Sequence, residues 1–192
     1  AEWTQISVSR LAGSAFMGVY HDPRHEGNPP GFTVTCCEIE LDLETGKYEI
    51  LDMVTIAESG TIVHPQGMEN QLVGGAVWGI GLSGYERHLY DPQNGLPAST
   101  GYWQSKVPTY LDTPVKIGTG WVDLPDPENP VGARGIGEPS MGAVSAALTA
   151  AITDALDGHH FATAPITADM IINHLAGTEE NAAPLAQNNF RG

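Results

Sequence analysis

The stretch Gly135-Ile136-Gly137-Glu138-Pro139-Ser140 decides the fold of this 192-residue chain, because it predicts where a long helix begins. Proline suits the first turn of a helix, where its missing N–H has no hydrogen bond to lose. Apolar and small residues then recur at spacings of three and four, which is typical of one buried helix face: Met141, Val144, Ser145, Leu148, Ala151, Ile152 and Ala155. Gly158 is the expected end of this alanine-rich helix.

Glu138 stands between two glycines and the helix start, an arrangement that suits a carboxylate held near a cofactor. Gly135 and Gly137 lack a Cβ and tolerate unusual backbone angles, so we expect the main chain there to approach a ligand closely. The helix N-terminus favours the ionised carboxylate, whereas burial beside a ligand favours the neutral acid, and this balance suits a general base. A glutamate in this position often serves only the helix dipole, and the residues alone leave that alternative open.

A hairpin and a glycine-rich helix are predicted upstream of this stretch. Strand-forming residues fill 32–41 and 47–57, and the turn residues 42–46 end in a glycine. The segment 66–84 carries six glycines among apolar residues, Gly67, Gly74, Gly75, Gly79, Gly81 and Gly84. Such a helix suits close approach to a backbone, a partner subunit or a cofactor, with tight burial without a ligand as the alternative. The expected fold class is α+β, with a β-hairpin or small sheet packed against a Gly-rich and an Ala-rich helix.

Two further elements complete the expected domain. Residues 115–124 predict a strand, and 165–175 predict a short helix capped by Thr167. Both flanks are richer in polar and turn-forming residues, so we expect them to lie outside the core. The chain then divides into an N-terminal extension that contacts a partner (1–31), one domain (32–176) and a polar tail (177–192).

Charge and composition exclude several classes of partner. The chain has 23 Asp and Glu against 8 Lys and Arg, a formal net charge of −15, which disfavours binding to nucleic acid or anionic membranes. No apolar run approaches the ~20 residues of a membrane span. The two cysteines, Cys36 and Cys37, are too few for an iron–sulfur cluster, which needs about four. Two reduced cysteines suit a cytoplasmic protein, with the periplasm as the alternative.

Three motifs occur in order along the chain: Glu40-Leu41-Asp42-Leu43-Glu44-Thr45-Gly46, a Gln-x-x-Gly-Gly helix at 71–81, and Gly132-Ala133-Arg134-Gly135-Ile136-Gly137-Glu138-Pro139. Together they resemble the C-terminal part of the molybdenum-binding catalytic subunit of the xanthine oxidase family, also called molybdenum hydroxylases. The resemblance runs from about Phe32 to Leu175. It implies that the domain at 32–176 binds a molybdopterin cofactor.

The resemblance also assigns roles to single residues. It implies that Glu138 is the general base, which accepts a proton at the molybdenum centre, and that Gln71 hydrogen-bonds the pyranopterin. The protein supplies no ligand to molybdenum itself, which is held through the pterin. Four further residues are expected to line the same cofactor site: Arg134, Gly135, Ile136 and Gly137. Two positions depart from the family pattern, since His64 replaces a common Asn and Glu58 a frequent Asp.

The implied activity is that of a molybdenum-dependent oxidoreductase, which oxidises an aldehyde or N-heteroaromatic substrate with water as the oxygen source. The implied cofactor is a molybdenum–pyranopterin, with the cytosine dinucleotide as one form, shared with a partner chain. Because the family's molybdenum subunit is much longer, we expect a split catalytic subunit that functions with a larger molybdenum-binding chain. An iron–sulfur subunit with 2Fe–2S clusters is a further expected partner, and a flavin (FAD) subunit another.

Two other functions stay open. The chain could be a non-catalytic assembly subunit of such a complex, or a nucleotide-binding module whose glycine-rich turn is 135–140. The second alternative lacks the acidic strand end expected about 20 positions after such a turn.

Overall fold

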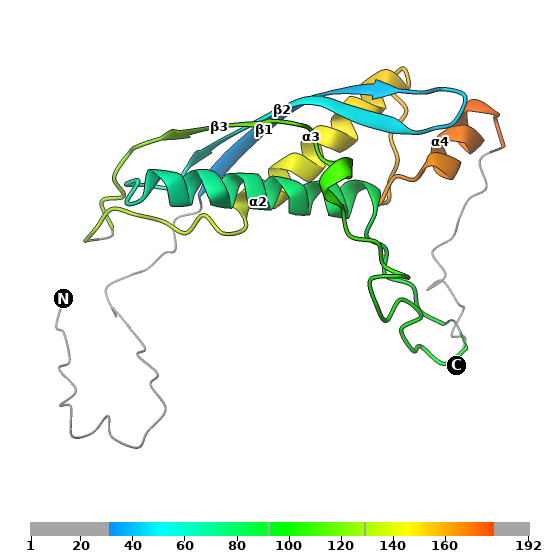
Figure 1. The fold of residues 1–192 in the computed structure, drawn as a ribbon, viewed down its shortest axis with the longest axis horizontal. Helices are drawn as coiled ribbons and strands as arrows, with labels where there is room; N and C mark the ends of the chain where they lie inside the picture. Colours follow the sequence, from blue (N-terminus) through cyan, green and yellow to red (C-terminus); the bar gives the residue numbers. More distant parts are fainter. Residues whose placement is uncertain (1–30, 92, 129, 179–192) are drawn as a thin grey trace. The chain divides into compact units, whose positions relative to one another are not determined.

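The computed structural model describes residues 31–91, 93–128 and 130–178, which form a three-stranded sheet with helices packed on it (Figure 1). The α+β fold class is therefore confirmed. The expected N-terminal extension, apart from Gly31, and the polar tail beyond Thr178 lie outside the described residues.

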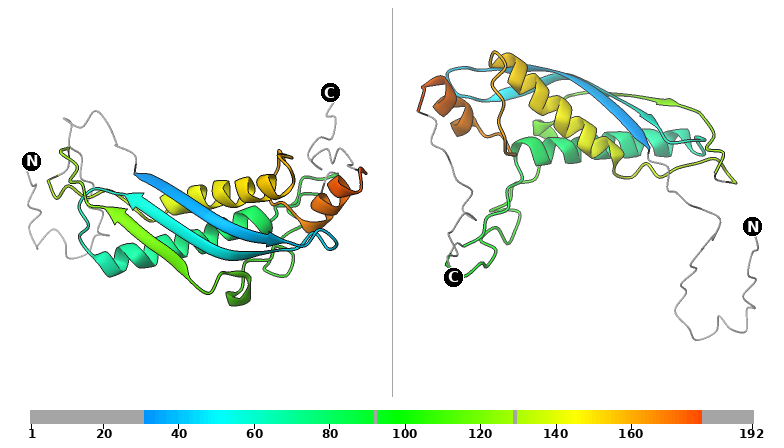
Figure 2. Two further views of the ribbon diagram at one scale, coloured as in Figure 1. Left: turned by 90° about the horizontal axis from the view of Figure 1, so that it is seen from above. Right: turned by 180° about the vertical axis from the view of Figure 1, so that it is seen from behind.

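The sheet has the order β1-β2-β3, with β1 at Phe32–Leu41, β2 at Tyr48–Glu58 and β3 at Ile117–Val122. β1 and β2 form the expected antiparallel hairpin, and β3 pairs with β2 in parallel (Figure 2). The third strand is shorter at both ends than the predicted 115–124.

The hairpin turn is held by the side chain of Asp42. Its carboxylate accepts hydrogen bonds from the Glu44 N–H and the Thr45 hydroxyl, both at 2.8 Å. The chain then turns back through Gly46, whose φ of +67° lies in the left-handed region that favours glycine. The turn thus fixes the register of the strands that carry the core.

Two long helices, α2 (Pro65–Gly84) and α3 (Pro139–Ala155), pack against the same face of the sheet. α3 lies mainly along β1, whereas α2 lies against β2 and β3. Met53 of β2, Ile80 of α2 and Val144 of α3 meet in one buried cluster. The predicted apolar stripe of α3 is confirmed at Leu148 and Ile152, which have no exposed surface.

The glycines of α2 let α3 approach its backbone. A Cβ at Gly79 would lie 2.6 Å from the carbonyl oxygen of Met141, and one at Gly75 would overlap the Ser140 hydroxyl. Gly74 has no neighbour within 4 Å of a Cβ and is exposed. Helix packing therefore accounts for Gly75 and Gly79 but leaves Gly74 without a partner among the described residues.

A short helix, α4 (Ala168–Leu175), closes one end of the core through the buried Ile171. It begins later than predicted, because the segment before it pairs with α2, where the Ile166 N–H donates to the Ser83 carbonyl at 2.7 Å. Thr167 does occupy the N-cap position, but its side chain makes no capping hydrogen bond, so that part of the prediction is wrong. A single 3₁₀ turn, η1 (Tyr110–Asp112), precedes β3.

The other face of the sheet is apolar and exposed in the described part of the chain. Five large apolar side chains lie on it, each at least 40% exposed: Phe32, Val34, Val54, Ile56 and Val122. Cys36 points to this face and Cys37 to the core, as their adjacent positions in β1 predict. None of the described helices is long and apolar enough to cross a membrane.

Candidate active site

The N-terminus of α2 is capped by His64, one of the two residues that depart from the family pattern. Its backbone is extended, and its Nδ1 accepts a hydrogen bond from the Gly67 N–H at 2.6 Å. Asparagine caps helices through the same kind of side-chain acceptor. His64 therefore takes over the capping role that the common Asn can perform.

Gln71 lies on the exposed side of α2, beside the loop that leads to α3. A Cβ at Gly137 would lie 3.8 Å from the Gln71 Oε1, so the two predicted site positions are neighbours. The Gln71 side chain is exposed and makes no hydrogen bond to another described residue. Its amide is free to bind a ligand.

The loop before α3 is pinned to the end of β2. Gly60 and Gly132 both have a φ of +75°, and a Cβ at Gly60 would overlap the Gly132 carbonyl oxygen. That oxygen accepts hydrogen bonds from the Thr61 N–H at 2.7 Å and the Asp126 N–H at 2.9 Å. Two segments more than 70 positions apart thus cross in direct backbone contact. The sequence patterns did not predict this crossing, although a glycine at each position is compatible with a tight turn.

Arg134 binds two carboxylates instead of pointing freely into the site. Its Nη1 donates to Glu58 at 2.5 Å and its Nε to Asp126 at 2.9 Å. These interactions raise the pKa of Arg134, and the hydrogen bond to Asp126 makes the largest contribution. The Arg134 N–H also donates to the Ser59 carbonyl at 2.6 Å. The family resemblance implied that Arg134 lines the cofactor site, but no sequence pattern predicted its ion pair with Asp126.

Glu138 occupies the N-cap position of α3, directly before Pro139 in the first turn, as predicted. Its side chain makes no capping hydrogen bond, is exposed, and accepts no hydrogen bond from any described residue. The Glu138 carboxylate therefore does not cap α3 through a side-chain hydrogen bond. It is available to an external group.

Gly135 and Gly137 flank this carboxylate, and neither adopts the left-handed backbone that favours glycine. The backbone conformation therefore does not require glycine at these two positions. Packing among the described residues does not require glycine either, since a Cβ at Gly135 would meet none of their atoms within 4 Å and one at Gly137 would make only an ordinary contact. Ile136 between them packs on the core residues Ala57, Met68 and Leu72. The two glycines leave bare backbone on both sides of Ile136.

The groups on this surface suit a flat, polar ligand. The N–H groups of Gly135, Ile136 and Gly137 donate to no other residue in the described ranges. Together with the Gln71 amide and the Glu138 carboxylate they offer several donors and one proton acceptor. A pterin ring carries carbonyl and ring-nitrogen acceptors, so this set of groups fits it. The described residues hold no group of three or more His, Cys, Asp or Glu that could bind a metal directly.

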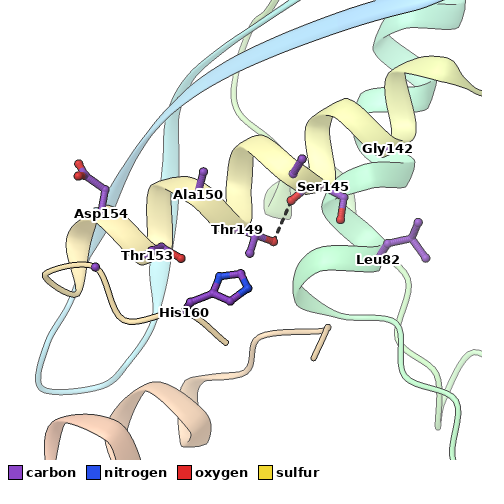
Figure 3. A pocket seen from close by; sticks show the side chains of 10 residues that line it. Leu82, Gly142, Ser145, Thr149, Ala150, Thr153, Asp154 and His160 are labelled. Carbon is purple, nitrogen blue, oxygen red and sulfur yellow. Dashed lines mark hydrogen bonds between the residues drawn. The ribbon is translucent and has the colours of Figure 1, made fainter. Parts of the chain in front are cut away.

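A separate groove runs along α3, away from this surface (Figure 3). Small side chains of α3, with Leu82 and His160, form its walls, and the Thr149 hydroxyl donates to the Ser145 carbonyl within it at 2.9 Å. Neither Gln71 nor Glu138 lines it. The candidate site is therefore an open surface, not this groove.

This fold and surface define a molybdopterin cofactor-binding domain, and the family model with that description matches residues 3–114. The match includes Gln71 and ends before Glu138. The chain belongs to the xanthine oxidase family of molybdenum hydroxylases, within its molybdenum-binding region, as the motifs predicted.

Individual relatives agree with this assignment. The chain is 36% identical over 147 residues to subunit gamma of the 6-hydroxypseudooxynicotine dehydrogenase complex of Paenarthrobacter nicotinovorans, covering 76% of this chain and 18% of that one. It is 30% identical over 152 residues to the xanthine dehydrogenase molybdenum-binding subunit of Escherichia coli O157:H7, covering 78% and 20%. The crystal structure of quinoline 2-oxidoreductase from Pseudomonas putida 86 superimposes with a TM-score of 0.67 at 31% identity, covering 72% and 18%. The chain spans about a fifth of the length of these relatives.

Proposed function

We propose that this chain supplies one wall of a molybdenum–pyranopterin active site in an oxidoreductase, with Glu138 as its general base. The observation that carries the proposal is the bare backbone at Gly135 and Gly137, which neither the backbone conformation nor packing among the described residues explains. A glycine that none of the described residues requires suits close contact with a ligand. The unpaired Gln71 amide and Glu138 carboxylate lie at the same place.

The cofactor would be held by the Gln71 amide and by the N–H groups of Gly135, Ile136 and Gly137, with Arg134 at the edge of the site. When bound, it supplies the redox chemistry and activates the oxygen source. Glu138 would accept the proton that this chemistry releases. The Glu138 carboxylate is exposed and accepts no hydrogen bond from a described residue, so it is available to accept that proton.

The rest of the site would come from a larger molybdenum-binding polypeptide, because the relatives are about five times as long as the segment they share with this chain. Oxidation of an aldehyde or N-heteroaromatic compound is the reaction we propose, since xanthine dehydrogenase and quinoline 2-oxidoreductase are among the relatives. Electrons would leave through an iron–sulfur subunit, with a flavin subunit as the next acceptor.

Replacement of Glu138 by Gln in the purified complex tests the proposal. We expect kcat to fall by about 10² to 10⁴, the range of general-base contributions, with an unchanged molybdenum content. The matched control is Glu69→Gln, which removes an equally exposed carboxylate from α2 and should leave kcat unchanged. Normal turnover of Glu138→Gln would instead support a non-catalytic assembly subunit. A complex without molybdenum would contradict the cofactor assignment.

A further inference from the structure

Three charged side chains next to the candidate site form one ion-pair cluster. The guanidinium of Arg134 bridges the carboxylates of Glu58 and Asp126, which lie 68 positions apart. The side chain of Asp126 is 3% exposed, that of Arg134 17% and that of Glu58 18%. Charges so shielded from water need partners, and these three supply them to one another.

The remaining oxygens of both carboxylates are also satisfied. Glu58 Oε1 accepts from the Gly60 N–H and Asp126 Oδ1 from the Glu128 N–H, each at 2.9 Å. Each carboxylate therefore fixes the backbone of its own loop as well as the guanidinium. Arg134 then joins the loop that follows β2 to the loop that precedes α3.

Only Gly135, Ile136 and Gly137 separate Arg134 from Glu138. Ile136 is held by the core, and α3 holds the far side of Glu138. On the near side, the Arg134 side-chain cluster holds the loop together with the backbone hydrogen bonds of Gly132 and Arg134. Loss of the side-chain cluster would loosen the segment 134–137 and with it the position of Glu138.

We infer that Arg134 is a positioning residue, which sets the place of Glu138 by clamping its loop between Glu58 and Asp126 rather than by binding the cofactor. The effect on catalysis rests on the proposed function. The clamp itself, the two ion pairs of Arg134 with Glu58 and Asp126, involves only contacts within this chain. A displacement of about 1 Å in a reacting group can lower a rate by up to about 100-fold.

Hydrogen exchange of the purified complex with Arg134→Met tests the clamp independently of activity. We expect the amides of Thr61, Asp126 and Arg134, which hydrogen-bond within and between the two loops, to exchange at least about tenfold faster, because local opening becomes easier, while those of α2 stay as in wild type. The matched control is Lys106→Met, which breaks the exposed ion pair between Lys106 and Asp112. It should leave the exchange of the Thr61, Asp126 and Arg134 amides unchanged.

Kinetics supply the second readout. We expect Arg134→Met to lower kcat by about 10-fold or more with little change in KM or molybdenum content, as loss of orientation does. Arg134→Lys should restore part of the rate, because a single ammonium can pair with one carboxylate but cannot bridge both in the same geometry. Glu58→Ala, which leaves Arg134 bound to Asp126, should give a smaller loss and serves if Arg134→Met does not fold.

Two results separate the two ideas. A fall in molybdenum content with unchanged exchange in both Arg134→Met and Glu58→Ala would overturn the clamp and make Arg134 a cofactor ligand. If Arg134→Met speeds the exchange of the three loop amides but the purified wild-type complex contains no molybdenum, the clamp stands and the proposed function is rejected.

Discussion

A Cβ on Gly79 of α2 would lie 2.7 Å from the Cβ of Val144 in α3, so the two helices meet where only glycine fits. The backbone oxygen of Met141 is equally near, at 2.6 Å, and a backbone cannot rotate away as a side chain can. This contact joins the helix that carries Gln71 to the helix that begins after Glu138. The spacing of the candidate site therefore depends on it.

Gly79→Ala should destabilise the protein by about 1–3 kcal/mol, the usual cost of overpacking a core. Urea unfolding followed by circular dichroism would measure the loss. Gly74→Ala, on the exposed side of the same helix, is the matched control and should gain about 0.5–1 kcal/mol, because alanine is the better helix former. Equal stabilities of the two variants would contradict the close approach of α2 and α3.

His64→Ala should cost about 1 kcal/mol of stability, because the Gly67 N–H loses its capping acceptor. His64→Asn should retain most of that stability, since asparagine is among the preferred N-cap residues. Thermal unfolding of the three proteins side by side would decide the matter. A His64→Asn variant as unstable as His64→Ala would show that the imidazole does more than cap α2.

Gln71→Ala should weaken retention of the cofactor about three- to tenfold, the range expected for loss of one hydrogen bond. Folding stability should not change, because the Gln71 side chain is exposed and unpaired within the described residues. Molybdenum and pterin per chain after gel filtration provide the measurement. Asn70→Ala removes a neighbouring exposed amide from another side of α2 and should bind cofactor normally.

The two cysteines should react at different rates with a thiol reagent. Burial raises the pKa of the Cys37 thiol, with a smaller contribution from Cys36, so less Cys37 thiolate exists at a given pH. Since the thiolate is the nucleophile, Cys37 should react slowly at pH 8 and faster as the pH rises. Cys36 is exposed and should react first. Mass spectrometry would follow the reaction. Cys36→Ser should remove the fast phase, and Cys37→Ser should remove the slow phase. If a partner chain covers Cys36, the fast phase should become slower.

Local patterns predicted the elements but not their long-range contacts. The limits of β1 and the start of α3 followed from strand-forming residues, from Pro139 and from helical spacing, whereas α3 ends at Ala155, before the expected Gly158. The start of α4 was placed too early, because Ile166 is drawn into a hydrogen bond with Ser83, which no local pattern reveals. In the same way, Arg134 was visible in its motif, whereas one of its carboxylate partners, Glu58, comes from the end of β2, 76 positions away. Family resemblance assigned Glu138 and Gln71, and the structure placed both on one side of the domain.

The contact between Gly60 and Gly132 limits how this region can be engineered. Because the two loops touch through their main chains, extra residues in either would push them apart and tilt the start of α3. The turn at 93–95 is different, because its residues are exposed and a Cβ at Gly95 would meet no described residue within 4 Å. A fluorophore or affinity tag should therefore be inserted at that turn, and the loops around Gly60 and Gly132 kept at their natural lengths.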